Sequence, residues 1–308
     1  MNNFLNISDH SSNVLRAIID EAKERKLKRK GLNKSAPDED KPFKGKSMAM
    51  IFEKPSTRTR MSFDIAAKQL GGSSIILNPD GIHYGKGDES LKDTAKVLTE
   101  YVDIIMLRTS SHKNLEEFGK YLDIPIINGL SDISHPCQIM SDILTYEESN
   151  DLITDKTVSW LGDGNNNMSN SLIEAAVKFN FKLKIGCPKK YAPSKKILTW
   201  AKKNKVKLIV TTKPDEAVKD SDCIMTDKWI SMNDKVNKKQ KKKILKPYQV
   251  NKKLMSKAKS DAIFMHCLPV GRGEEVTDEI IDGKQSVVWR QALNRVHAQK
   301  SIIKWCLD

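Results

Sequence analysis

Short apolar runs alternate with amphipathic segments along most of the chain. Apolar residues that recur every three or four positions predict helices, and short β-branched runs bounded by turn residues predict buried strands. In the first half this pattern predicts strands at 48–52, 73–77, 103–107 and 124–128, and helices at 61–70, 90–101, 114–122 and about 136–148. A further helix is predicted before them, with an apolar stripe at 14–22 and either Asp9 or Ser11 as its cap. The second half is predicted to hold strands at 157–161, 182–186, 207–211, 223–226 and 263–266, and helices at 169–179, 194–203 and about 292–306.

Strands that alternate with helices favour parallel sheets covered by helices on both faces. We therefore predict an α/β protein with two doubly wound domains and mostly parallel sheets. The expected domains are 1–134 and 150–289, joined by a helix at 135–149, and the last helix, about 290–308, is expected to pack back on the first domain. Ligands of open α/β sheets bind beyond the carboxyl ends of strands, so we expect the active site in a cleft between the domains.

Composition restricts the class of protein. The chain has 308 residues, of which 39% are hydrophobic and 30% charged, as in a soluble globular protein. No apolar run reaches the length of a membrane span, and the first residues do not resemble a signal peptide. The five cysteines are scattered and include no Cys-x-x-Cys pair, which predicts neither disulfides nor a zinc site. A reducing cytoplasm is the expected location.

The formal net charge of +14 raises the alternative of a nucleic-acid- or polyphosphate-binding protein. Much of the excess lies in two runs, at 23–30 and 235–246, which contain no aromatic residues and accompany no nucleic-acid-binding motif. We interpret these runs as solvated helix faces. A positive field would still steer an anionic substrate toward the protein.

The chemistry is concentrated where the first strand meets its helix. After the strand at 48–52, the sequence Ser56-Thr57-Arg58-Thr59-Arg60 places hydroxyl and guanidinium groups at a predicted helix start. Free backbone N–H groups and the helix dipole favour an anion there, and an arginine can hold two phosphate oxygens at once. A solvated helix cap would use similar residues. The segment is nevertheless a candidate phosphate site.

Other reactive side chains also follow predicted strands or open helices. Arg108, Asp227 and Cys267 directly follow strands, and His135 and Gln138 lie at a helix start. Taken singly, each has an ordinary explanation: a surface arginine, a structural histidine or a small buried cysteine. Gly162-Asp163-Gly164 also follows a strand, but Asn167 stands where a dinucleotide-binding fingerprint needs its third glycine.

Taken together, these segments resemble the aspartate/ornithine carbamoyltransferase family. Ser-Thr-Arg-Thr-Arg at 56–60 resembles the family's phosphate motif, and His-Pro-Cys-Gln at 135–138 its His-Pro-x-Gln motif. The segment 227–233 resembles Asp-x-x-x-Ser-Met-Gly, and His-Cys-Leu-Pro at 266–269 is of the ornithine type, whereas the aspartate branch carries Pro-Leu-Pro. Gly-Asp at 162–163 and Asn-Arg at 294–295 also match, so the resemblance spans the chain and points to the ornithine branch.

The resemblance implies transfer of a carbamoyl group from carbamoyl phosphate to the side-chain amine of L-ornithine, within arginine metabolism. It assigns catalysis to Cys267, Asp227, Arg108 and His135. Carbamoyl phosphate binding is assigned to Ser56, Thr57, Arg58, Thr59, His83, Arg108, His135, Gln138, Cys267, Leu268 and Arg295. Ornithine binding is assigned to Asn167, Asp227, Ser231 and Met232. No metal or organic cofactor is expected, and the expected assembly is a homotrimer or a multiple of trimers, in which His83 serves a neighbouring subunit.

Some positions depart from the family pattern or leave alternatives open. Asn233 stands where the family loop ends in glycine, and the turn at 165–167 is longer by one residue, so Asn166 is the alternative to Asn167. The loop after His83 also has an extra residue, which leaves its register open. A related transferase acting on putrescine is the nearest alternative function. Putrescine lacks the α-amino and carboxylate groups that the segment 227–232 is expected to bind.

Overall fold

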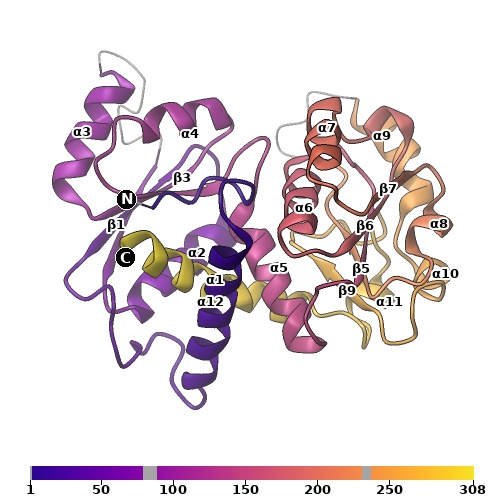
Figure 1. The fold of residues 1–308 in the computed structure, drawn as a ribbon, viewed down its shortest axis with the longest axis horizontal. Helices are drawn as coiled ribbons and strands as arrows, with labels where there is room; N and C mark the ends of the chain where they lie inside the picture. Colours follow the sequence, from indigo (N-terminus) through magenta and orange to yellow (C-terminus); the bar gives the residue numbers. More distant parts are fainter. Residues whose placement is uncertain (1, 79–88, 231–236) are drawn as a thin grey trace. The chain divides into compact units, whose positions relative to one another are not determined.

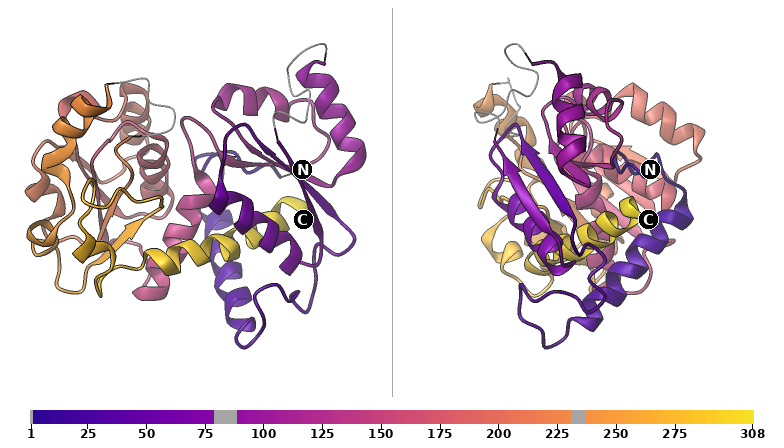
Figure 2. Two further views of the ribbon diagram at one scale, coloured as in Figure 1. Left: turned by 180° about the vertical axis from the view of Figure 1, so that it is seen from behind. Right: turned by 90° about the vertical axis from the view of Figure 1, so that its left-hand side faces the viewer.

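The computed structural model describes residues 2–78, 89–230 and 237–308 (Figure 1). The chain forms two compact units. Unit 1 comprises Met1–Leu144 and Leu293–Asp308, and therefore contains both ends of the chain (Figure 2), whereas unit 2 comprises Thr145–Ala292. Both units are α/β folds built on parallel sheets, the predicted class.

Unit 1 is built on a four-stranded parallel sheet with the order β2-β1-β3-β4. Its strands are β1 (Ser47–Phe52), β2 (Ser73–Leu77), β3 (Ile104–Arg108) and β4 (Ile126–Leu130). Its helices are α1 (Ser12–Lys28), α2 (Thr57–Gln69), α3 (Leu91–Tyr101) and α4 (His112–Gly119), with most of α5 (Pro136–Ser149) and of α12 (Val288–Leu307).

Unit 2 contains a five-stranded parallel sheet with the order β7-β6-β5-β8-β9. Its strands are β5 (Thr157–Leu161), β6 (Lys182–Gly186), β7 (Leu208–Thr211), β8 (Cys223–Thr226) and β9 (Ile263–His266). Its helices are α6 (Asn167–Lys178), α7 (Lys195–Lys203), α8 (Pro214–Val218), α9 (Lys238–Leu245), α10 (Lys252–Met255) and α11 (Asp278–Ile281), with the short 3₁₀ helices η2 (Lys189–Tyr191) and η3 (Lys246–Tyr248).

Each sheet reverses its winding direction once. In unit 1 the chain moves from β1 outward to β2 and then returns to β3, and in unit 2 it moves from β5 to β6 and β7 before it returns to β8. Ligands of open α/β sheets bind at such switch points, beyond the carboxyl ends of the two strands that flank them. The candidate phosphate segment follows β1, and Arg108 is the last residue of β3. In unit 2, Asp227 follows β8.

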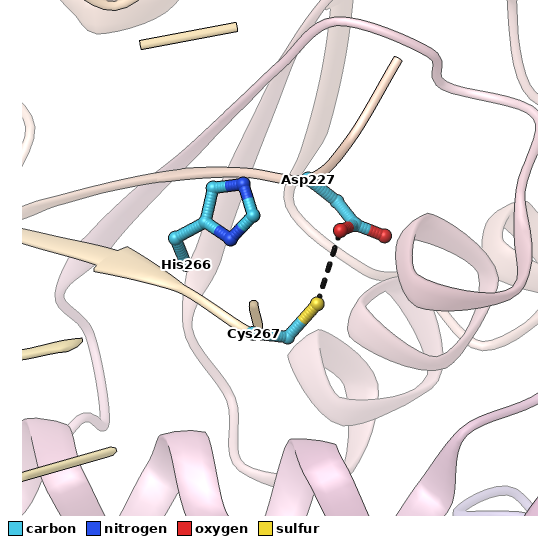
Figure 3. A group of neighbouring side chains, drawn as sticks. All are labelled: Asp227, His266 and Cys267. Carbon is cyan, nitrogen blue, oxygen red and sulfur yellow. Dashed lines mark hydrogen bonds between the residues drawn. The ribbon is translucent and has the colours of Figure 1, made fainter. Parts of the chain in front are cut away.

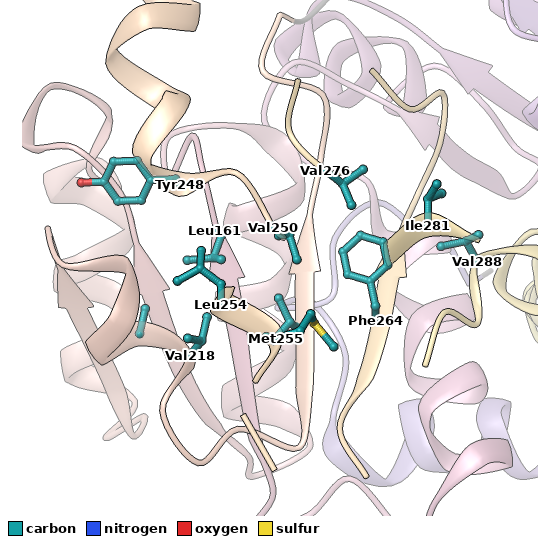
Figure 4. Packing of buried hydrophobic residues seen from close by; sticks show 12 residues of the cluster. Leu161, Val218, Tyr248, Val250, Leu254, Met255, Phe264, Val276, Ile281 and Val288 are labelled. Carbon is teal, nitrogen blue, oxygen red and sulfur yellow. The ribbon is translucent and has the colours of Figure 1, made fainter. Parts of the chain in front are cut away.

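Apolar side chains from strands and helices form a core in each unit. In unit 1, Ile51, Ile105, Leu107 and Phe118 are fully buried in one such cluster. In unit 2, residues of β5, β8 and β9 pack against the segments that follow α9, and Figure 4 shows Phe264 among Met255, Val276, Ile281 and Val288. These cores hold the strand ends that carry the candidate site residues.

Several element boundaries differ from the sequence prediction, and two of these differences have an identifiable physical reason. The strand predicted at 124–128 begins at Ile126 because Pro125 has no N–H to donate, although its carbonyl accepts from the amide of Ile105. The last helix begins at Val288 instead of Ala292, since Val288 packs into the unit 2 core. In the described parts of the chain, no helix is long and apolar enough to cross a membrane.

The interpretation of both basic runs as solvated faces was partly wrong. Arg25, in α1, is only 7% exposed and donates to Asp38 at 3.0 Å and to Asp40 at 2.6 Å. Lys241, in α9, is also buried and lies 2.6 Å from a carboxylate oxygen of Asp163. A helix face that is polar throughout can still bury one or two charges when another segment supplies the counter-charge, and the runs themselves do not reveal which ones.

Candidate active site

The turn between β1 and α2 has the geometry of an anion site. Ser56 is the N-cap of α2 with extended backbone angles (φ −157°, ψ 104°), and its hydroxyl makes no capping hydrogen bond. The first N–H groups of α2, from Thr57 onward, therefore keep their donor capacity, and the helix dipole adds partial positive charge. Arg58 and Ser56 are half-buried at this end, and Thr59 is almost fully buried.

Glu53 joins the turn to the end of β3. One of its carboxylate oxygens accepts from the Thr109 hydroxyl at 2.7 Å, and the other accepts from the backbone N–H of Ser110 at 2.9 Å. The backbone N–H of Glu53 donates to the carbonyl of Arg108 at 2.9 Å. These hydrogen bonds lock the two segments on either side of the switch point to each other. The fixed geometry places the guanidinium of Arg108 near α2.

A hydrogen-bonded cluster brings together four of the predicted site residues, with Thr59 at its centre. Its hydroxyl accepts from Arg108 at 3.0 Å and from Arg295 at 2.7 Å. Arg295 also donates to the side-chain oxygen of Gln138 at 2.8 Å, and the Gln138 amide nitrogen donates to Asp142 at 2.8 Å. Arg108, Gln138 and Arg295 are all less than a tenth exposed. The cluster therefore holds two guanidinium groups in a buried, fixed arrangement.

His135 lies in the same positive environment. It is 4% exposed, and burial together with the charges of Arg295, Arg108 and Arg58 holds its pKa well below the ordinary histidine value. The imidazole is therefore neutral at neutral pH. A neutral imidazole can donate a hydrogen bond to a substrate carbonyl without adding a further full charge.

Arg60, the second arginine of the segment, is held apart from this cluster. Its guanidinium donates to the side-chain oxygen of Asn78 at 2.8 Å and lies 5.0 Å from the centre of the Phe52 ring. It fixes the start of α2 to the ends of β1 and β2. The two arginines of one motif thus have different surroundings.

In unit 2, Asp227 and Cys267 follow the neighbouring strands β8 and β9. The Cys267 thiol donates to a carboxylate oxygen of Asp227, with 3.1 Å between sulfur and oxygen, as Figure 3 shows. Parallel pairing of Thr226 with His266 brings the two following residues to the same sheet edge. A thiol and a carboxylate in contact form a short path for a proton.

The segment after Cys267 adopts an unusual backbone conformation. Leu268 has a φ of 58°, in the left-handed region that residues other than glycine rarely adopt, and its N–H donates to a ring nitrogen of His266 at 2.8 Å. Such backbone strain clusters at functional sites, where surrounding contacts maintain it. The other ring nitrogen of His266 lies 3.2 Å from Glu275. His266 is thus a support for the Cys267-Leu268 backbone.

The structure distinguishes between the two asparagines at the start of α6. The side chain of Asn166 caps this helix by accepting from the N–H of Ser169 at 2.8 Å, and Ser169 returns a bond to the N–H of Asn166. Asn167 is the first helical residue and is half-buried. The capping role of Asn166 supports Asn167 as the candidate ligand. His83, Ser231, Met232 and Asn233 lie outside the described residues.

Comparisons with known proteins identify the family of this chain. Residues 2–148 match the carbamoyl-P binding domain of aspartate/ornithine carbamoyltransferases, and residues 154–306 match the Asp/Orn binding domain of the same proteins. The chain belongs to the aspartate/ornithine carbamoyltransferase family.

Similar family members are named ornithine carbamoyltransferase. The Brucella suis protein is 48% identical over 305 residues, covering 99% of this chain and 95% of the relative. The Nitrobacter winogradskyi protein is 50% identical over 305 residues, covering 99% and 96%. Among solved structures, ornithine carbamoyltransferase from Pyrococcus furiosus has a TM-score of 0.91 at 42% identity and covers 98% of this chain and 96% of its own.

Asp227, His266 and Cys267 of this carbamoyltransferase lie close enough together to resemble a metal-binding group. Both ring nitrogens of His266 already have hydrogen-bond partners, the N–H of Leu268 and the carboxylate of Glu275. Because an imidazole coordinates a metal through a nitrogen lone pair, His266 would have to give up the Leu268 contact to do so. The geometry favours a support for the backbone over a metal centre.

Several residues that organise the family's motifs were missed by the sequence prediction. Glu53, Asp142 and Glu275 support site residues through hydrogen bonds. Asp142 follows Gln138 by four positions on one helix, a spacing that brings side chains together and could have suggested the contact. Glu53 and Glu275 act across segments, so no local signal in the sequence identifies them.

Proposed function

We propose that the protein transfers the carbamoyl group of carbamoyl phosphate to the side-chain amine of L-ornithine and forms L-citrulline and phosphate. The observation that carries this proposal is the Asp227–Cys267 contact at the edge of the unit 2 sheet. It lies in the part of the chain that matches the Asp/Orn binding domain, and His-Cys-Leu-Pro at 266–269 is the ornithine-type sequence.

In this proposal the start of α2 binds the phosphate. The hydroxyls of Ser56 and Thr57 and the N–H groups of the first helical turn donate to its oxygens, and the Arg58 guanidinium pairs with its charge. Among the described residues, the Arg58 side chain makes no hydrogen bond or ion pair, which leaves its donors for a ligand. Carbamoyl phosphate is anionic, so the net charge of +14 assists its approach.

The carbonyl oxygen of the substrate would be polarised by Arg108, Arg295, Thr59 and His135. As the amine nitrogen attacks the carbonyl carbon, negative charge grows on this oxygen, and the fixed guanidinium groups stabilise it. Gln138 would orient the carbamoyl NH₂ group, and the backbone at Cys267 and Leu268 would accept hydrogen bonds from it. The tetrahedral intermediate then collapses as the bond between carbon and phosphate oxygen breaks.

Ornithine must lose a proton before its amine can attack, since an alkylammonium has a pKa near 10 and no lone pair. We assign this proton transfer to Cys267 and Asp227, with the departing phosphate as a further acceptor. Asp227 also suits the α-ammonium of ornithine, and Asn167, with Ser231 and Met232, suits the remaining polar groups. No step in this scheme needs a redox or organic cofactor, because carbamoyl phosphate is already activated.

We also propose a homotrimeric assembly in the cytoplasm, with His83 completing the site of a neighbouring subunit. Support for a subunit contact comes from β2, an edge strand of unit 1 on which Ile75 and Ile76 are 49% and 38% exposed. Exposed aliphatic residues on a strand at the edge of a sheet are typical of surfaces that another chain covers. All five cysteines are free thiols, as a reducing compartment would favour.

A citrulline assay with competing acceptors tests the proposed reaction. Purified protein is supplied with carbamoyl phosphate and with ornithine, putrescine or aspartate, and both the carbamoylated product and the released phosphate are measured. We expect citrulline with ornithine and at least a hundredfold lower kcat/KM with the other acceptors. Preference for putrescine would instead identify the related transferase. Absence of transfer combined with salt-sensitive binding of nucleic acid would overturn the enzymatic proposal.

A further inference from the structure

A buried ion pair lies next to the turn that carries Asn167. The ammonium of Lys241 in α9 is 2.6 Å from a carboxylate oxygen of Asp163, and the two side chains are 4% and 9% exposed. The neighbouring Lys238, Lys239 and Lys243 of α9 are exposed. Lys241 is thus buried against a specific counter-charge, whereas its lysine neighbours are exposed. The sequence of the basic run does not indicate which lysine is buried.

Asp163 uses its other carboxylate oxygen to shape the turn. That oxygen accepts from the backbone N–H of Asn165 at 2.8 Å, and the Asp163 carbonyl accepts from the Trp160 indole at 2.9 Å. Asn166, the next residue, is the N-cap of α6. A single carboxylate therefore connects the end of β5, the start of α6 and helix α9.

Tyr191 of η2 forms the third side of this arrangement. Its ring centre is 5.1 Å from the Lys241 ammonium, and its carbonyl accepts from the N–H of Gly164 at 2.8 Å. A Cβ at Gly164 would lie 2.9 Å from that carbonyl oxygen, so only glycine allows the approach. Asp163 and Tyr191 thus have two roles each. The Asp163 carboxylate and the Tyr191 ring contact the Lys241 ammonium, and the same two residues accept hydrogen bonds from N–H groups of the turn.

From this geometry we infer that Lys241 is a positioning residue for the amino-acid substrate, acting through Asp163 on the turn that presents Asn167. This inference rests on the proposed function. The ion pair fixes the turn against α9, and Asn167 is held at the beginning of α6 as a result. Because a buried charge is costly without its partner, loss of Lys241 should displace the Asp163 carboxylate and the Asn165 N–H bonded to it.

Lys241→Met tests this role because it removes the charge and retains an unbranched side chain. We expect the KM for ornithine to rise at least tenfold and the KM for carbamoyl phosphate to change less than twofold. Lys241→Arg keeps the charge and should restore most of the ornithine affinity. Lys239→Met is the matched control: the same substitution, two residues away on an exposed side chain, should leave both values unchanged.

A double-mutant cycle with Asp163→Asn separates positioning from general damage. Asparagine keeps an oxygen for the N–H of Asn165 but loses the charge that pairs with Lys241. If the pair acts as a unit, the double variant should have an ornithine KM no higher than the worse single variant. The double variant also removes both buried charges, which makes it the form to use if Lys241→Met does not fold.

Two results would overturn the inference, and neither resembles failure of the proposed function. One is an ornithine KM of Lys241→Met equal to that of the Lys239→Met control. The other is strict additivity of the effects of Lys241→Met and Asp163→Asn on the ornithine KM in the double-mutant cycle. In both cases the wild-type protein still forms citrulline. If wild type forms none, the proposed function itself has failed, whatever the variants do.

Discussion

Two guanidinium groups depend on the hydroxyl of Thr59, the smallest side chain of the unit 1 cluster. Thr59→Val keeps the shape and removes the acceptor, so Arg108 and Arg295 lose a shared fixed point. We expect kcat to fall about ten- to a hundredfold, equivalent to about 1.4–2.7 kcal/mol of transition-state stabilisation. Steady-state kinetics measures this, and Thr59→Ser should stay within a few fold of wild type. Equal turnover of the Val and Ser forms would contradict the role of the hydroxyl.

The thiol of Cys267 has a different role from that of the phosphate ligands. Cys267→Ala removes the donor to Asp227 and leaves α2 untouched, so we expect kcat to decrease about ten- to a hundredfold while carbamoyl phosphate affinity is preserved. Titration with a non-reactive phosphonate analogue measures that affinity. Arg58→Ala serves as the contrasting control, because it should weaken analogue binding strongly. A large loss of analogue affinity in Cys267→Ala would show that the thiol is mainly a binding group.

At the residue scale the sequence located side chains at strand ends better than it predicted their hydrogen-bond partners. Arg108 and Cys267 could be placed at strand ends because each follows an apolar run, and strand ends are where α/β sheets bind ligands. The contact of Thr59 with Arg295 spans 236 positions and has no local pattern. Asn166 was left as an alternative to Asn167 because capping depends on where the helix begins, which periodicity locates only within a few residues.

At the scale of elements, α12 is fixed by a buried polar network as much as by apolar contacts. Lys300 is fully buried and donates to Asp38 at 2.8 Å and to Gln69 at 3.2 Å, and Lys26 of α1 donates to Asn294 at 2.7 Å. The recurrence of apolar residues every three or four positions predicted that a helix would form near the end of the chain. It could not predict that a lysine would be buried in it, because the counter-charge comes from a loop 262 positions away.

His297 gives this helix a measurable pH dependence. Burial, followed by the charges of Lys300, Lys26 and Arg29, lowers its pKa to about 3. Between pH 6.5 and 3 the unfolded chain binds a proton that the folded chain does not, so the free energy of unfolding decreases as pH falls, by about 1.4 kcal/mol per unit. His297→Asn should make this decrease shallower by up to about 1 kcal/mol per pH unit. Urea unfolding at pH 7, 6 and 5 measures both slopes.

His135, whose pKa is also lowered by burial and nearby arginines, contributes in the same direction and is present in both proteins. It therefore cancels in the comparison of wild type with His297→Asn. The measurements stay at pH 5 and above, where most carboxylates are still ionised in both states. Identical slopes for the two proteins would mean that His297 is protonated in the folded state at pH 5, contrary to its buried and positively charged surroundings.

For the whole molecule, the sequence predicted two α/β units and the parallel direction of their sheets, because alternating strands and helices leave few other arrangements. The strand orders β2-β1-β3-β4 and β7-β6-β5-β8-β9 were not predicted, since order depends on which face each crossover helix covers. The assembly state is even harder to predict from local sequence patterns than the strand order. The sequence supplies the family expectation of a trimer, and β2 supplies an exposed apolar edge.

Mixed trimers test whether subunits share sites. We predict that Arg58→Ala and His83→Ala proteins, each nearly inactive alone, regain activity after their subunits are exchanged. In a cyclic trimer with both kinds of subunit, one junction joins an intact Arg58 to an intact neighbouring His83. Random 1:1 exchange should therefore restore on the order of a quarter of wild-type activity. The citrulline assay measures the recovery after exchange in mild denaturant.

The control for this recovery is a pair of variants that affect the same unit of the same subunit. Arg58 and Arg295 both belong to unit 1. Arg295 donates a hydrogen bond to Thr59, which lies in the same segment as Arg58. Every site in an Arg58→Ala and Arg295→Ala mixture therefore lacks one arginine, whatever its neighbours supply, so exchange should restore nothing. Recovery in both mixtures would point to better folding of mixed assemblies, and recovery in neither would place His83 within the site of its own subunit. Only recovery confined to the His83 mixture requires a site completed across a subunit boundary.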